Sequence, residues 1–264
     1  MSEEARRASG GPARLRLGGI QIDALGFGGA LDAIEGLVVR GRGGAVFTAN
    51  VDHVVLAEDD AAFRDAYAHA DLALADGMPI VWASRLLPVR VPERVAGSDL
   101  LLPLLNRAAQ RRWPVFLLGG APGSAEAAAE EARALGVEVC GAAAPRIPAD
   151  PGAPDPEGEA ALEQVRTARP SLVLVGLGAP KQELWIHRHR AALAPAVALG
   201  VGAAIDFLAG KVRRAPPLVA RAGLEWAWRL ASEPRRLWRR YLLRDPRFAV
   251  VLARELRRAG RAGR

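Results

Sequence analysis

The sequence has few features that would set its compartment or tie it to a membrane. It holds one cysteine, Cys140, in 264 residues, which excludes an intrachain disulfide and favours a reducing compartment. Its long uncharged stretches, such as 191–205, are rich in alanine and glycine and too short to cross a bilayer. Because the first residues lack an apolar core and a cleavage site, we expect residues 1–14 to form a flexible N-terminus rather than a signal peptide.

Familiar catalytic and metal-binding signatures are also missing. The chain has no GxSxG nucleophile elbow, and it has no Asp-x-Asp triplet that could hold a metal ion beside a nucleotide diphosphate. The four histidines (His53, His69, His187 and His189) have no carboxylate or cysteine partner at a spacing typical of metal ligands. We therefore predict no metal site.

Net positive charge is absent from the first 210 residues and concentrated at the C-terminal end. From Lys211 onward there are sixteen Lys and Arg residues against four Asp and Glu residues. Residues 1–210 hold twenty basic and twenty-five acidic residues. The net charge is therefore +12 in the last segment and −5 before it, which together give the +7 of the whole chain.

The sequence does contain a regular alternation of short apolar runs and helical patterns. Apolar runs bounded by Gly and Pro are typical of strands buried on both faces of a parallel sheet. We predict strands at 16–22, 44–49, 71–74, 114–119, 137–141, 171–176 and 196–201. Helices are predicted near 28–41, 51–69, 78–87, 98–111, 123–135, 156–168 and 180–190. The alternation predicts an α/β domain over 15–212, with a doubly wound, Rossmann-like, mostly parallel sheet.

A C-terminal helical appendage is predicted over residues 213–264. No strand pattern occurs there, and prolines at 234 and 246 are placed to end one helix or open the next. The helical patterns cover 216–232, 235–244 and 247–259.

Polar residues gather where the predicted strands end, and ligands of open parallel sheets bind beyond the carboxyl ends of the strands. Thr48 and Asn50 lie at the end of one strand. Asp76 follows the next strand along the chain, on a turn with Gly77. We expect these residues to meet at one edge of the sheet.

Two glycine-containing turns also lie at strand ends. The first holds Gly119 and Gly120, and the second holds Gly178, followed by Lys181 and Gln182 at the start of a helix. Backbone N–H groups at a helix N-terminus can bind a diphosphate, and a lysine beside them suits phosphate charge. The same glycines can instead serve only a tight crossover, since neither turn is a full GxGxxG or GxxxxGK[ST] motif.

Asp76 is open to two interpretations. A carboxylate on a glycine turn can be the N-cap of the helix predicted at 78–87. It can instead be a general base, if it lies within hydrogen-bond reach of the hydroxyl that it deprotonates. Arg94 and Asp99, in the string VPERVAGSD, can pair at the surface or meet an anionic ligand.

Six strings taken together resemble one known family. In order, TANVDH, ADGMP, PERVAGSD, FLLGGAPGSAE, VGLGAPKQELW and GVGAAIDFLAGKVRRAP match the WecG/TagA/CpsF family of glycosyltransferases, over residues 15–245. The resemblance implies transfer of N-acetylmannosamine or a related sugar from UDP to an undecaprenyl-diphosphate-linked acceptor of GlcNAc type, in teichoic acid or exopolysaccharide synthesis. It also implies an inverting, metal-independent reaction with no cofactor, on the cytoplasmic face of a bacterial cell membrane.

The resemblance assigns roles to residues as well. It makes Asp76 the general base, and Thr48 and Asn50 groups that position the substrate. Donor or acceptor binding is implied for Arg94, Asp99, Gly119, Gly120, Gly178, Lys181 and Gln182, and for an arginine of the appendage, with Arg214, Arg221 and Arg229 as candidates. Pro79 in ADGMP stands where many relatives have glycine, which changes the backbone after the base.

The appendage predicts a partner through its own pattern. Within 235–244, three arginines (236, 240 and 244) fall on one helical face and aromatic and leucine residues on another. This pattern is typical of helices on an anionic membrane surface. A solvated cationic face with packed aromatics is one alternative, and a nucleic-acid-binding segment is another. We favour the membrane and no nucleic acid, because the body resembles an enzyme for a lipid-linked substrate, and we leave a homo-oligomer open.

A nucleotide-dependent oxidoreductase is a further function class that the fold permits. Against it, the first βα turn, IDALGFGGALD, is not a full GxGxxG motif, and no acidic residue follows at the expected strand end.

Overall fold

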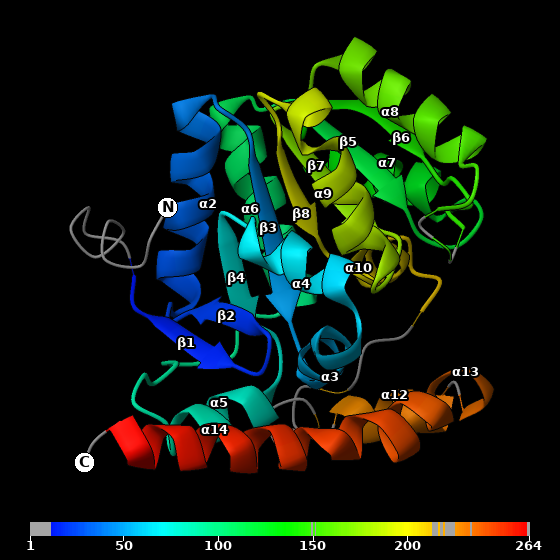
Figure 1. The fold of residues 1–264 in the computed structure, drawn as a ribbon. Helices are drawn as coiled ribbons and strands as arrows, with labels where there is room; N and C mark the ends of the chain where they lie inside the picture. Colours follow the sequence, from blue (N-terminus) through cyan, green and yellow to red (C-terminus); the bar gives the residue numbers. More distant parts are fainter. Residues whose placement is uncertain are drawn as a thin grey trace.

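The computed structural model describes residues 12–148, 150, 152–212, 216, 219, 225–232 and 234–262 of the chain. These residues form an α/β body, and the helices of the C-terminal appendage lie along one end of it (Figure 1). The predicted fold class, a doubly wound Rossmann-like sheet with a helical appendage, is confirmed.

A parallel sheet forms the centre of the body. Its strands are β3 (Gly44–Ala49), β4 (Leu72–Ala75), β5 (Val115–Gly119), β6 (Val139–Ala143), β7 (Leu172–Gly176) and β8 (Val197–Gly200). They are hydrogen-bonded in the order β4-β3-β8-β7-β5-β6, and every pairing is parallel. Because the strands all point the same way, their carboxyl ends lie along one edge of the sheet, where a ligand site is expected.

Helices cover both faces of this sheet. In the body they are α2 (Phe27–Arg40), α3 (Val51–Asp59), α4 (Ala61–Ala68), α5 (Met78–Ser84), α6 (Gly97–Arg111), α7 (Ser124–Ala134), α8 (Pro156–Ala168), α9 (Lys181–Leu193) and α10 (Ala204–Leu208). Apolar residues of α2, α6, α7 and α10 share one core with Val46, and those of α4, α8 and α9 share the other with Phe47. Successive residues of a strand thus enter opposite cores, which explains why the strands read as continuous apolar runs.

The single strand predicted at 16–22 is wrong, because this segment forms a hairpin. Its strands are β1 (Arg14–Leu17) and β2 (Ile20–Asp23), which pair antiparallel. The chain reverses at Gly18, whose φ of 62° is readily adopted by glycine. The hairpin packs beside β4, where Asp23 Oδ2 accepts a hydrogen bond of 2.9 Å from Ala73 N–H. It therefore covers an edge strand that would otherwise be open to pairing.

Two other boundaries differ from the predictions. The helix predicted at 51–69 is divided into α3 and α4 at Asp60, whose carboxylate accepts a hydrogen bond of 3.0 Å from Phe63 N–H and so caps α4. The strand predicted at 137–141 begins at Val139 instead.

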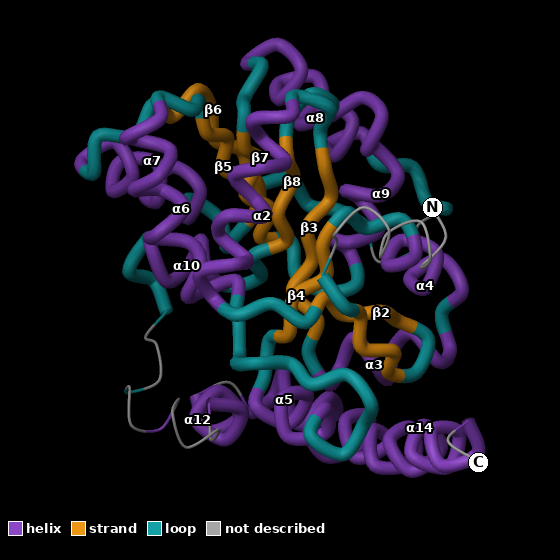
Figure 2. The backbone as a smooth tube through the Cα atoms, turned by 90° about the vertical axis from the view of Figure 1, so that its left-hand side faces the viewer, coloured by secondary structure: helices purple, strands orange, loops and turns teal. Residues whose placement is uncertain are grey.

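The appendage runs beneath the carboxyl edge of the sheet (Figures 1 and 2). Its described segments are α12 (Glu225–Ser232), α13 (Pro234–Trp238), a π-helical segment (Arg239–Arg244), a 3₁₀ turn (Asp245–Arg247) and α14 (Phe248–Ala262). α14 packs against α3 and β1. Among the described residues, no helix combines the length and the apolar character needed to cross a membrane. The predicted domain boundary after residue 212 stays a prediction, since 213–215 lie outside the described residues.

Candidate active site

A cavity of about 910 Å³ lies at the carboxyl edge of the sheet. Its body wall contains residues at or just beyond the ends of β3, β4, β5, β7 and β8, and its other wall is the appendage from Trp226 to Ala249. In Figure 2, α12 and α14 lie beneath the ends of these strands. The cavity is therefore enclosed by two parts of the chain that are far apart in sequence, and its volume suits a nucleotide-sized ligand.

Asp76 lines this cavity directly after β4. Its N–H donates a hydrogen bond of 2.6 Å to Ala49 O, which ties the end of β4 to the end of β3. The N-cap of α5 is Gly77, with φ 143°, rather than Asp76. The capping alternative for Asp76 is therefore wrong, while its role as general base stays a prediction.

Arg94 is the cation beside Asp76. Arg94 Nη1 lies 4.0 Å from Asp76 Oδ1, and Arg94 Nη2 forms a short ion pair with Asp99 Oδ2. Arg94 lines the cavity and Asp99, in the first turn of α6, does not. Asp99 thus positions the guanidinium of Arg94 from outside the cavity.

Thr48 and Asn50 meet in the cavity as expected. Thr48 is buried, and its hydroxyl donates a hydrogen bond of 3.2 Å to Gly200 O at the end of β8. Asn50 is the N-cap of α3, where its Oδ1 accepts from His53 N–H over 3.2 Å. The same Oδ1 accepts a hydrogen bond of 3.1 Å from Arg240 Nη2, so Asn50 is also a contact point for the appendage.

Gln182 lines the cavity from the first turn of α9. Its Oε1 accepts a hydrogen bond of 3.1 Å from Gly202 N–H, and its Nε2 donates one of 2.6 Å to Glu183 Oε1. Glu183 is fully buried, and this burial raises its pKa to about 7. Glu183 therefore fixes the amide of Gln182 from behind the cavity, a role that was not predicted from the sequence.

In the glycine turn after β5, two N–H groups bind within the protein. Gly120 N–H donates to Gly176 O over 2.9 Å, and Ala121 N–H donates to Asp206 Oδ1 over 2.7 Å. A Cβ on Gly119 would lie 2.7 Å from Gly176 C, so this glycine serves the close packing of β5 and β7. Gly120 and Ala121 line the cavity, but these two N–H groups are taken up within the protein. Substrate binding by Gly119 and Gly120 stays a prediction.

In the second glycine turn, one of the two predicted ligand contacts lines the cavity and the other does not. Gly178 lines the cavity, and a Cβ built there has no neighbour within 4 Å. Lys181, expected beside it as a phosphate contact, does not line this cavity. Its ammonium donates a hydrogen bond of 3.0 Å to Ile147 O and faces a smaller pocket. The structure therefore contradicts the prediction that Lys181 contacts a phosphate in this cavity.

Arginines of the appendage reach the cavity instead. Arg229 lines it, as do Arg240 and Arg244, which were predicted to face a membrane. Arg214 and Arg221 lie outside the described residues. Among the described residues, Arg94, Arg229, Arg240 and Arg244 line the cavity, which is therefore suited to a strongly anionic ligand.

A buried aspartate holds two of these arginines. Asp52 is 2% exposed, and its carboxylate lies 3.2 Å from Arg240 Nε and 2.5 Å from Arg244 Nε. The i, i+4 spacing of the two arginines places them on one face, as predicted, but that face turns inward. Only a buried carboxylate that pairs with both arginines would have indicated an inward face. Asp52, in the string TANVDH, is that carboxylate, and it was not identified from the sequence.

The expectation for the histidines is corrected. His53 is buried, its Nδ1 lies 2.6 Å from Tyr67 Oη, and burial lowers its pKa to about 3. The statement that no histidine has a carboxylate partner is wrong, because Asp65 lies close to both His69 and His187. The i, i+4 spacing of Asp65 and His69 was a signal that could have been read from the sequence.

Two comparisons with known proteins bear on this arrangement. The family model described as "Glycosyl transferase WecG/TagA/CpsF family" matches residues 15–262. A protein of Bacillus spizizenii named N-acetylglucosaminyldiphosphoundecaprenol N-acetyl-beta-D-mannosaminyltransferase is 32% identical over 218 residues, 82% of this chain and 81% of that protein. The resemblance found in the six strings is thereby confirmed over nearly the whole chain.

Proposed function

The chain belongs to the WecG/TagA/CpsF family and is a glycosyltransferase, and on that premise we propose that it transfers N-acetylmannosamine or a related sugar from UDP to GlcNAc-diphosphoundecaprenol. The acceptor and the sugar follow the name of the Bacillus spizizenii relative. Family membership removes the oxidoreductase and nucleic-acid alternatives as the main function.

The observation that carries the mechanism is the position of Asp76. Its carboxylate stands at a strand end in a large cavity, Gly77 rather than Asp76 is the N-cap of α5, and Arg94 lies 4.0 Å away. A general base needs an accessible carboxylate within reach of the substrate hydroxyl. The Asp76 side chain is 29% exposed, so an acceptor can approach it.

In the proposed reaction, Asp76 accepts the proton of an acceptor hydroxyl. The hydroxyl oxygen attacks the anomeric carbon on the face opposite the diphosphate. The bond between that carbon and the diphosphate oxygen breaks, and UDP leaves with the electron pair, so the configuration inverts. Arg94, Arg229 and Arg240 supply the positive charge that stabilises the leaving diphosphate.

The charge distribution of the cavity orients the donor. Asp206, on α10, lines the cavity beside the turn after β5 and disfavours a diphosphate there. A carboxylate oxygen accepts hydrogen bonds from hydroxyls, so this end suits the ribose of the nucleotide. The diphosphate then extends toward Arg94 and the arginines of the appendage.

The appendage supports a peripheral membrane location for the reaction. Trp238, Leu242 and Leu243 are 40%, 56% and 62% exposed, and they lie in a segment rich in arginine. Large exposed apolar side chains beside cations are typical of segments that lie at an anionic lipid surface. We therefore propose that this face meets the cytoplasmic leaflet that holds the acceptor.

The test is release of UDP by the purified protein from a panel of UDP-sugars, with a short-chain prenyl-diphosphate-GlcNAc acceptor, with and without EDTA. Acceptor-dependent release from UDP-N-acetylmannosamine that EDTA does not change is the expected result. Release that requires a divalent ion would overturn the metal-independent mechanism, and failure to bind UDP would overturn the donor assignment.

A further inference from the structure

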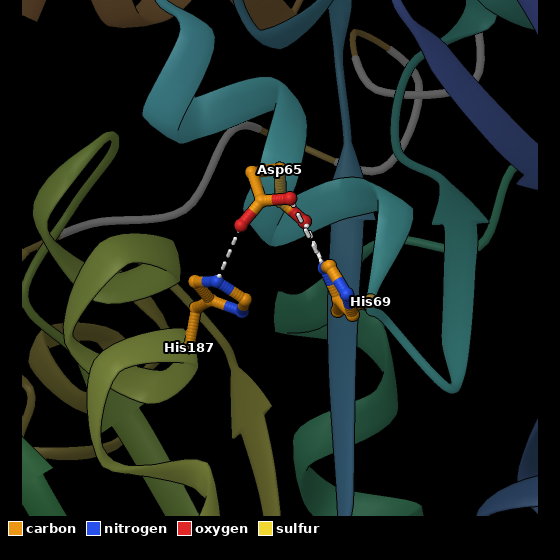
Figure 3. Close-up of side chains that lie close together, drawn as sticks. All are labelled: Asp65, His69 and His187. Atoms are coloured by element: carbon orange, nitrogen blue, oxygen red, sulfur yellow. Dashed lines mark hydrogen bonds and ion pairs between the residues drawn. The ribbon is translucent and has the colours of Figure 1, made fainter.

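Three side chains that the proposed transfer does not use meet on the surface between α4 and α9. Asp65 lies on α4, His69 directly after it, and His187 on α9 (Figure 3). Each offers one ligand atom, and these atoms all lie within 4.8 Å of one another. None of the three lines the large cavity, so the cluster is separate from the transfer site.

We propose that Asp65, His69 and His187 form a binding site for a divalent transition-metal ion of the Zn²⁺ type, which joins α4 to α9. Two imidazole nitrogens and one carboxylate oxygen suit Zn²⁺, Co²⁺, Ni²⁺ and Cu²⁺. Mg²⁺ and Ca²⁺ prefer sites made of oxygen atoms alone. Water completes the coordination, because the cluster lies at the surface.

The distances in the cluster are close to those of a metal site. Asp65 Oδ2 lies 3.0 Å from His187 Nε2, and Asp65 Oδ1 lies 3.3 Å from His69 Nδ1. In a tetrahedral zinc site, whose metal–ligand bonds are close to 2 Å, neighbouring ligand atoms are about 3.3 Å apart. The two carboxylate–imidazole distances thus need almost no change.

To bind an ion, the side chains must move slightly, and the two most exposed ones have room to do so. Asp65 and His69 are 58% and 50% exposed, whereas His187 is 24% exposed and better fixed. The two imidazole rings already lie near each other, with centroids 5.2 Å apart and ring planes inclined by 34°. Rotation of exposed side chains therefore closes the cluster around an ion without moving either helix.

Binding has one identifiable local cost. His69 Nδ1 also lies 2.9 Å from the main-chain oxygen of Asp65, a contact that needs a proton on Nδ1. Coordination through Nδ1 moves this proton to Nε2 and gives up the contact. The ion gains a carboxylate and two imidazoles in exchange, so the site is expected to bind metal with moderate rather than high affinity.

Metal binding at this site is expected to affect the stability of the fold and not the rate of sugar transfer. α4 and α9 pack against each other, and α9 carries Gln182 into the cavity from its first turn. An ion held by both helices stabilises the folded state in proportion to its occupancy. The readout of this proposal is therefore metal binding and thermal stability, independent of any sugar transfer.

The experiment uses full-length protein freed of any affinity tag, labelled with ¹⁵N-histidine and stripped of metal by a chelator. The chain has four histidines, so the two buried ones, His53 and His189, are internal controls. On titration with ZnCl₂, the imidazole signals of His69 and His187 should shift with one ion bound per chain, while those of the controls stay. MgCl₂ should leave all four unchanged, and ZnCl₂ should raise the melting temperature.

Variants complete the test. Asp65→Asn, His69→Gln and His187→Gln should each lower zinc affinity by at least about tenfold, and each should melt like the wild type when metal is absent. Glu163→Gln, which changes an exposed carboxylate on α8, should bind zinc as the wild type does. The proposal is overturned if His69 and His187 do not respond to millimolar zinc, or if the three variants bind zinc as tightly as the wild type.

Discussion

Arg240 donates a hydrogen bond of 3.1 Å to Asn50 Oδ1, although the two residues are 190 positions apart in the chain. One belongs to the appendage and the other ends the first central strand of the body. Their contact closes the cavity across its two walls. The site is thus complete only when the appendage is docked, and several predictions depend on this contact and its neighbours.

Asp76→Asn should lower the turnover rate by about 10²–10⁴, the usual contribution of a general base, because an amide cannot accept the acceptor proton. Affinity for UDP should change little. The measurement is UDP release together with calorimetric UDP binding. Asp32→Asn, at an exposed position of α2, is the matched control and should keep full activity. Turnover near the wild-type rate in Asp76→Asn would mean that another group is the base.

Asp52→Asn should loosen the appendage, because Arg240 and Arg244 lose a carboxylate that is 2% exposed. We expect a loss of about 1–2 kcal/mol in the free energy of unfolding and a larger KM for the UDP-sugar. Faster cleavage of the appendage by trypsin should accompany both changes.

A matched control for this variant lies on the same helix. Asp59→Asn removes an ion pair with Arg247 that is exposed on both sides, so its effect on stability should be close to zero. Equal effects of Asp52→Asn and Asp59→Asn on proteolysis and KM would contradict the role given to Asp52.

Glu183→Gln should change how stability depends on pH. Burial raises the pKa of Glu183 from 4.5 to about 7, so the folded protein keeps a proton that the unfolded chain releases. The contribution of Glu183 to the free energy of unfolding is therefore fully present below about pH 4.5 and is lost as pH rises through about 7. The variant keeps a neutral side chain and avoids this loss, so its stability relative to the wild type should rise across the window, by up to about 3 kcal/mol.

Urea unfolding at a series of pH values measures this difference. His53 has the opposite dependence, because burial lowers its pKa to about 3, but it is present in both proteins and cancels. Glu163→Gln, which removes an exposed carboxylate on α8, is the control variant measured in the same way. A pH-independent difference for Glu183→Gln would show that Glu183 is ionised in the folded protein.

Replacing Trp238 and Leu243 together by serine should weaken binding to vesicles that contain phosphatidylglycerol by roughly tenfold or more. Each large apolar side chain that is buried in an apolar environment contributes about 1.5–3 kcal/mol. Cosedimentation with vesicles measures the effect, and added salt should weaken binding by the wild type. Val39→Ser, at an exposed position on α2, is the control. Vesicle binding that is unchanged in the double variant would place the membrane face elsewhere.

The central sheet was predictable because each strand is a short apolar run between breakers. The hairpin at its edge was not, since Gly18 and Gly19 reverse the chain inside a run that reads as one strand. The division of α3 from α4 was also missed, although Asp60 has the residue type of an N-cap. In both cases the break is marked by only one or two residues inside a longer regular pattern. A search for hydrophobic periodicity over that length does not detect such a break.

The candidate site was predictable where a strand end fixes a residue's position, as for Thr48 and Asp76. The site was not predictable where the contacts of a side chain depend on residues that are distant in the sequence and adjacent only in the folded structure. Lys181 turns to Ile147, and Arg240 turns to Asp52 rather than to solvent. The direction of a charged side chain depends on which partner is buried nearby, and this is a property of tertiary packing.

Under the proposed function, the shared wall of the cavity makes nucleotide binding and docking of the appendage mutually dependent. If the docked appendage raises the affinity for the nucleotide-sugar by some factor, the bound nucleotide-sugar must raise the docking equilibrium by the same factor. The apparent affinity is then the intrinsic affinity reduced by the fraction of molecules whose appendage is closed. At the proposed membrane location, a lipid surface that favours the closed appendage would therefore increase retention of the donor without contacting it, and would thus activate the enzyme.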